Sequence, residues 1–109
     1  MAAVGENEEV AMLESEFQTE LRNQLKARFP GCLVLKQDPN MRQGIPDLLV
    51  LFEDKWASLE TKRGFKSEKR PNQEYYVHQF DDMSFARFVN PENMTEVLDD
   101  LQSTFRPGG

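Results

Sequence analysis

The sequence is poor in the residues that form disulfides, zinc sites and thiol-based active sites. Cys32 is its only cysteine and His78 its only histidine. A lone cysteine forms no intramolecular disulfide, and one cysteine with one histidine cannot assemble a Cys/His zinc site. Zinc fingers and Cys-His proteases are therefore not expected, and Ser58 and Ser84 have no histidine in a motif that would make a hydrolase triad.

Long apolar runs are also missing. No run approaches the roughly 20 residues that a membrane helix needs, and the first ten residues lack the basic start and apolar stretch of a signal peptide. We therefore expect an intracellular, non-secreted protein, cytoplasmic or, in a eukaryote, nuclear. With 109 residues, 39% of them hydrophobic and 29% charged, the chain has room for one small globular domain.

Positive charge is in deficit. Thirteen basic residues against nineteen acidic ones give a net charge of −6, the wrong sign for a protein that holds nucleic acid by a broad basic face. Any contact with DNA should be local. The balance fits a group of carboxylates that binds a divalent cation, although a solvated acidic surface is the commoner explanation.

Apolar periodicity predicts the helices. Apolar residues recur at steps of three and four between Val10 and Leu25 and predict a helix over about 8–28, whereas 1–7 shows no periodicity and is expected to be a disordered N-terminus. Pro71 suits a first helical position. The helix that it starts has an apolar face expected to contain Tyr75, Tyr76, Phe80 and Met83.

Apolar runs between turn formers predict four strands, over residues 32–36, 48–52, 55–62 and 85–89. A last helix is expected to start at Pro91. The predicted fold class is α/β, a small mixed β-sheet flanked by helices in the order α-β-β-β-α-β-α, as a single domain over 8–106.

A tight turn at Glu53-Asp54 would set the register of the first hairpin. It places Phe52 opposite Lys55 and, at the far end, Asp47 opposite Glu60. Facing carboxylates destabilise a sheet by ~0.5 kcal/mol unless a positive charge intervenes. Lys62 is expected on the same face as Glu60. A turn one residue longer or shorter would put the two acids on opposite faces.

Two close carboxylates are suitable ligands for Mg²⁺, which takes oxygen ligands in an octahedron and keeps several waters. A neighbouring ammonium could orient a water molecule or offset charge on a phosphate. Asp47, Glu60 and Lys62 therefore suit metal-assisted phosphodiester hydrolysis. The alternative is an exposed hairpin whose charges only keep its edge soluble, with Lys62 screening Glu60.

These residues resemble the motifs of the PD-(D/E)XK nucleases, with Pro46-Asp47 as the first half and Glu60-Thr61-Lys62 as the second. Within that superfamily the chain is most similar to VRR-NUC domains, the virus-type replication and repair nucleases, over roughly residues 13–101. Three further matches to that family are Glu14–Gln18 in the first helix, Gly44–Leu48 before the second strand, and Gln73 after the basic loop.

The resemblance implies a restriction-endonuclease-like core in which Asp47, Glu60 and the backbone carbonyl of Thr61 bind Mg²⁺, for which Mn²⁺ can substitute. Lys62 would position or help activate the attacking water. Gln73 would bond a phosphate or brace Lys62, the alternative being an exposed glutamine at a helix start.

A glutamate of the first helix is expected to complete the metal site. The family pattern favours Glu14, with Glu16 as its rival. The basic loop, with Arg63, Lys66, Lys69 and Arg70, would contact DNA phosphates. A solvated loop is equally compatible with its composition.

The function implied is a Mg²⁺-dependent DNA endonuclease, structure-selective for branched DNA or Holliday junctions, in a phage or in repair. The alternative is a catalytically inactive module of the same fold that binds nucleic acid or a protein. Such a small chain offers little footprint on a duplex, so a homodimer is a further hypothesis. Tyr75 and Tyr76 could stack on a base, although helix packing explains at least one of them more simply.

Overall fold

The computed structural model describes residues 2–38, 40, 42–63 and 69–106, with side chains from residue 15 onward. Three helices and four strands follow one another in the predicted order. The elements are α1 (Ala2–Arg28), β1 (Leu33–Lys36), β2 (Leu48–Phe52), β3 (Lys55–Thr61), α2 (Pro71–Met83), β4 (Ala86–Val89) and α3 (Met94–Phe105). The chain is therefore a small mixed α/β protein.

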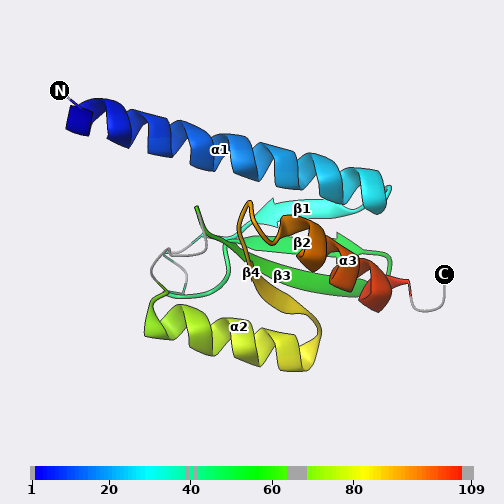
Figure 1. Cartoon of the computed structure of the whole chain (residues 1–109). Coiled ribbons are helices and arrows are strands. Elements are labelled where there is room, and N and C mark those ends of the chain that lie inside the picture. Colours follow the sequence, from blue (N-terminus) through cyan, green and yellow to red (C-terminus); the bar gives the residue numbers. More distant parts are fainter. Residues whose placement is uncertain (1, 39, 41, 64–68, 107–109) are drawn as a thin grey trace.

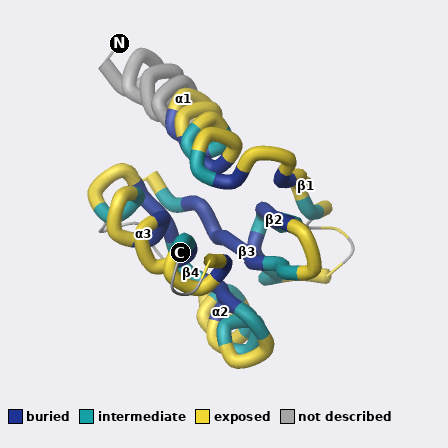
Figure 2. Tube along the Cα trace, turned by 90° about the vertical axis from the view of Figure 1, so that its right-hand side faces the viewer, coloured by how far each residue is buried: buried dark blue, intermediate teal, exposed yellow. Residues whose placement is uncertain are grey.

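The four strands form one sheet in the order β1-β2-β3-β4. The β1–β2 and β2–β3 pairs are antiparallel, and β3–β4 is parallel because α2 carries the chain back between them. The predicted mixed sheet is thus confirmed. Figure 1 shows α1 and α2 on opposite faces of the sheet, and Figure 2 shows α3 on the same side as α1.

The core lies between the sheet and the α1–α3 layer. Phe17, Leu21 and Leu25 of α1 are buried because steps of four and four place them on one helix face. Three rings, Phe29, Phe52 and Phe105, meet with centroids 5.2 to 5.8 Å apart and close the core at one end. This packing sets which face of α1 lies against the sheet.

The β2–β3 hairpin has the predicted register. Phe52 pairs with Lys55 across the two-residue turn, and Leu48 pairs with Leu59 at the other end. Glu53 in the turn has a φ of 57°, a conformation that glycine adopts more easily. Since the register holds along the hairpin, the next residues out, Asp47 and Glu60, come together where β2 begins and β3 ends.

Two helix boundaries differ from the sequence-based prediction. α1 begins at Ala2 instead of near residue 8, and alanine at residues 2 and 3 with no proline nearby favours that extension. Most of the segment predicted to be disordered, 1–7, is thus assigned to α1, although its side chains lie outside the described residues.

α3 begins at Met94 instead of Pro91. Asn90 and Asn93 exchange side-chain to backbone bonds of 2.8 Å in both directions, and these bonds favour a turn before the helix.

The predicted apolar face of α2 is wrong in part. Val77 is its one buried residue, Tyr76 and Phe80 are half-buried, and Tyr75 and Met83 are 60% and 63% exposed. The helix packs on β3 and β4, at one side of the sheet, and these contacts leave Tyr75 and Met83 largely exposed. None of the described helices combines the length and the hydropathy that crossing a bilayer requires.

Candidate active site

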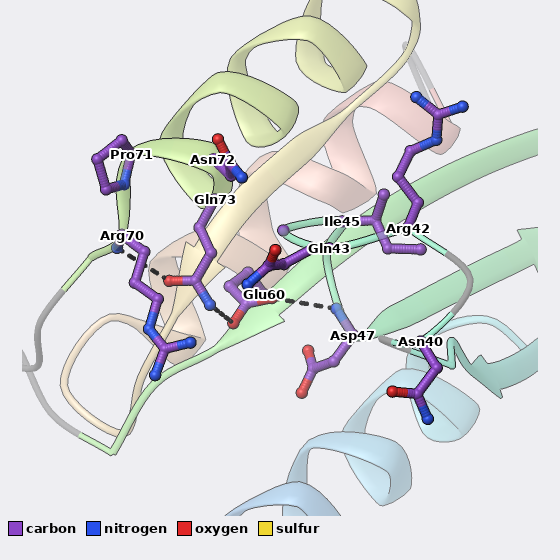
Figure 3. Close-up of a pocket in the computed structure, with 11 residues that line it drawn as sticks. Asn40, Arg42, Gln43, Ile45, Asp47, Glu60, Arg70, Pro71, Asn72 and Gln73 are labelled. Atoms are coloured by element: carbon purple, nitrogen blue, oxygen red, sulfur yellow. Dashed lines mark hydrogen bonds between the residues drawn. The ribbon is translucent and has the colours of Figure 1, made fainter.

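A cleft of about 870 Å³ opens at the end of the sheet where β2 begins and β3 ends (Figure 3). It is lined by the loop before β2, by Glu60 near the end of β3 and by the first turn of α2. Its polar lining includes Asn40, Arg42, Asp47, Glu60, Arg70 and Gln73. The two facing acids predicted from the hairpin register therefore lie in the cleft.

Asp47 and Glu60 are directly linked. The backbone N–H of Asp47 donates to Glu60 Oε1 at 3.2 Å. Glu60 is only 6% exposed, and this burial, together with the charge of Asp47, raises the pKa of its carboxyl to about 7, against the opposing effects of Lys62 and of the Asp47 N–H. Near neutral pH, the cleft thus holds a carboxyl that gives up its proton more reluctantly than usual.

The Asp47 carboxylate is held by Thr61, the residue after Glu60. The Thr61 backbone N–H donates to Oδ1 at 3.0 Å and its hydroxyl donates to Oδ2 at 2.6 Å. Gln18 of α1 supports both partners, because its Nε2 lies 3.0 Å from the Thr61 hydroxyl and 3.3 Å from Asp47 Oδ2. The orientation of Asp47 therefore depends on α1 as well as on the hairpin.

Lys62 and Glu60 are joined through Gln73. Gln73 Oε1 accepts from Lys62 Nζ at 2.6 Å, while Gln73 Nε2 donates to Glu60 Oε2 at 3.1 Å. Lys62 Nζ is itself 3.8 Å from Glu60 Oε2. Of the two roles predicted for Gln73, the contact with Lys62 is the one present in the structure, and Gln73 keeps the ammonium close to the acid pair.

Gln73 is placed by the start of α2. Pro71 is the first helical residue, as predicted, and the Arg70 backbone N–H donates to Gln73 Oε1 at 3.2 Å. The loop before β2 comes very close to this turn. A Cβ on Gly44, whose φ is +94°, would lie 2.5 Å from Asn72 Cβ, so only glycine fits there.

The basic residues predicted to contact DNA differ in how close they lie to the cleft. Arg70 lines the cleft, Lys69 Nζ lies 4.7 Å from the centre of the Phe88 ring, and Arg63 is exposed. Lys66 lies outside the described residues. Of the two rival glutamates on α1, Glu16 is exposed, whereas the side chain of Glu14 lies outside the described part.

Asp47 and Glu60 stand as a pair in the described structure. Among the side chains described from residue 15 onward, no three His, Cys, Asp or Glu residues are grouped as metal ligands. Each carboxylate oxygen can accept more than one contact, so the bonds just described leave the pair able to bind a cation. A cation would also relieve the repulsion that raises the pKa of Glu60.

Two residues of the site were not assigned roles from sequence. Gln18 is the last residue of the Glu14–Gln18 motif. Its position directly after the apolar Phe17 is the sequence feature that could have indicated a role for it. Arg42 lines the cleft from the loop before β2, where no periodicity indicates its position.

Searches against protein-family models, curated proteins and solved structures find no match to the chain.

Proposed function

We propose that the chain is a Mg²⁺-dependent DNA endonuclease of the PD-(D/E)XK superfamily and VRR-NUC type. The observation that carries the proposal is the cleft in which Asp47 and Glu60 face each other with Lys62 Nζ 3.8 Å from Glu60. Holding the buried acid Glu60 beside the half-buried acid Asp47 costs stability. A role in cation binding explains why the chain bears this cost. A hairpin whose charges only keep its edge soluble would not explain it.

Mg²⁺ would be held by Asp47 and Glu60, with the Thr61 carbonyl and Glu14 completing the set. When bound, it supplies a Lewis acid next to the scissile phosphate. Thr61 and Gln18 act as positioning residues, because their bonds fix the Asp47 carboxylate before any ligand arrives.

Lys62 is the group proposed to orient the attacking water or to offset charge on the phosphate. Gln73 holds its ammonium in place from one side and bonds Glu60 from the other. Arg70 and Arg42 line the cleft on either side of Glu60 in Figure 3, where they can contact the phosphates that flank the cleavage site. The proposed contacts with DNA thus use a few basic side chains around the cleft, consistent with the net charge of −6 of the chain.

The preferred substrate is proposed to be branched DNA, since phosphate contacts alone read shape rather than sequence. We also propose a homodimer, which would provide two sites for two strands. Analytical ultracentrifugation tests this part separately: a mass of one chain at a concentration that gives full activity would rule out the dimer.

The direct test is cleavage of labelled four-way junction, flap, duplex and single-stranded DNA, with Mg²⁺ or Mn²⁺ and with EDTA. The Asp47→Asn variant should lose cutting while it keeps its fold and its DNA binding. The matched control is Asp100→Asn, because Asp100 is an exposed acid on α3 and does not line the cleft. This control should cut like the wild type.

Cutting that depends on metal and on Asp47 would support the nuclease. A folded protein that binds DNA but cuts none of these substrates with either metal would contradict it, and would favour the alternative, a non-catalytic binding module.

A further inference from the structure

Packing of α2 against the sheet does not account for an aromatic side chain at Tyr75. It is 60% exposed, whereas Val77, two residues later, is the buried residue of α2. Its ring centre lies 5.1 Å from that of Tyr76, and the two ring planes are nearly perpendicular at 78°. Tyr76 in turn packs on Phe80 at 5.9 Å. Tyr76 is thus anchored in the fold and supports a tyrosine that remains largely in solvent.

This tyrosine pair adjoins the cleft. The Arg42 guanidinium, which lines the cleft, donates to Tyr76 Oη at 3.1 Å. On α2, Tyr75 follows the cleft-lining residues Pro71 and Asn72 by four and three positions, and therefore lies on their side of the helix. Long helical side chains also lean toward the N-terminus of their helix. Both observations place the tyrosines at the edge of the cleft on the Arg42 side.

We propose that Tyr75, supported by Tyr76 and Arg42, forms a platform on which an unpaired DNA base stacks next to the cleavage site. The proposal rests on the proposed function and specifies its substrate class: DNA with a single-stranded segment leading out of the cleft.

Two features of the platform favour an unpaired base. An exposed aromatic ring beside a cation is what single-strand binding uses, with the ring taking the base and the cation taking the backbone. Bases inside a duplex have both faces covered by their neighbours, so only a base at an end, in a flap or in a loop offers a free face to Tyr75.

The surroundings of Tyr75 do not favour a protein partner. Its neighbours on α2, Glu74 and His78, are exposed and polar. The other largely exposed apolar residue of the helix, Met83, lies two turns further along. The two therefore do not form the continuous apolar patch that marks a protein interface.

The experiment measures binding without cutting. Asp47→Asn protein with Mg²⁺ is titrated onto single-stranded, flapped and fully paired oligonucleotides that carry 2-aminopurine, whose fluorescence falls when it stacks. Tyr75→Ala, Tyr75→Phe and Met83→Ala are each added to this background. Met83→Ala is the matched control, because it removes an equally exposed apolar side chain of α2 that lies two turns further from the cleft than Tyr75.

We expect Tyr75→Ala to raise Kd for single-stranded and flapped DNA by about 5- to 100-fold and to abolish the quenching, with duplex affinity unchanged. Tyr75→Phe should restore both, and Met83→Ala should have no effect. Equal Kd values for Tyr75→Ala and Met83→Ala would overturn the platform. An equal loss on duplex and single strands would overturn the assignment to unpaired bases.

These outcomes are separable from failure of the nuclease proposal. A wild-type chain that cuts DNA while Tyr75→Ala binds normally refutes the platform alone. Tyr75-dependent quenching by a wild-type chain that cuts nothing would support the platform and refute the nuclease.

Discussion

Glu60 should make the metal-free protein less stable as the pH rises. The pKa of its carboxyl is about 7 in the folded chain, against an ordinary value of 4.5. Folding therefore favours the protonated form. The stability that this proton confers is complete below about pH 4.5 and is lost as the pH rises through 7.

The size of the effect follows from the two pKa values. Between pH 5 and pH 8, the ionisation of Glu60 should lower the free energy of unfolding by about 2–3 kcal/mol. Glu60→Gln keeps the shape of the side chain but cannot ionise, so the variant should escape this loss. At pH 8 in EDTA, we expect it to be more stable relative to wild type than at pH 5, by about 2–3 kcal/mol.

Urea unfolding at the two pH values measures this difference. Glu96→Gln is the control, since Glu96 is an exposed acid on α3 and should show no comparable pH dependence. Adding Mg²⁺ at pH 8 should stabilise the wild type and leave Glu60→Gln almost unchanged. A wild-type protein that loses no stability between pH 5 and pH 8, or a Glu60→Gln variant that gains none, would refute the reasoning.

Three further substitutions test the supports of the site. Thr61→Val removes the hydroxyl that bonds Asp47 and should weaken Mg²⁺ binding by about 10- to 100-fold in calorimetry; unchanged affinity would deny Thr61 a positioning role. Gly44→Ala should destabilise the fold by at least about 1 kcal/mol more than Gly31→Ala in urea unfolding, because both have positive φ but only Gly44 lacks space; equal losses would contradict the close approach to α2. Glu53→Gly should stabilise the hairpin by about 0.5–1 kcal/mol in thermal unfolding, and a lower melting temperature would argue against the left-handed turn.

The features predicted most accurately from the sequence are those that depend on pairing between residues close together in the chain. The hairpin register follows from a two-residue turn and the apolar pattern on both sides of it, so the meeting of Asp47 and Glu60 could be predicted without a structure. Pro71 likewise marked the first residue of α2, which places Gln73 within reach of Lys62.

Contacts that depend on tertiary packing could not be predicted in this way. Gln18 reaches Asp47 across 29 positions because the packing of Phe17 and Leu21 sets the rotation of α1, and periodicity alone does not fix that rotation. The exposure of Tyr75 depends on which strands α2 covers. Side-chain bonds between Asn90 and Asn93, not the proline between them, decide where α3 begins.

The amide oxygen of Gln73 accepts from Lys62 Nζ and from the Arg70 backbone N–H, so it ties together the two ends of the intervening segment. Insertions or deletions within that segment can therefore leave Lys62 and the acid pair where they are. The entropic cost is small, since doubling a loop costs only about 0.6 kcal/mol. If the proposed nuclease activity holds, the length and sequence between Lys62 and Arg70 could therefore be redesigned to change substrate preference while Asp47, Glu60 and Lys62 stay in place.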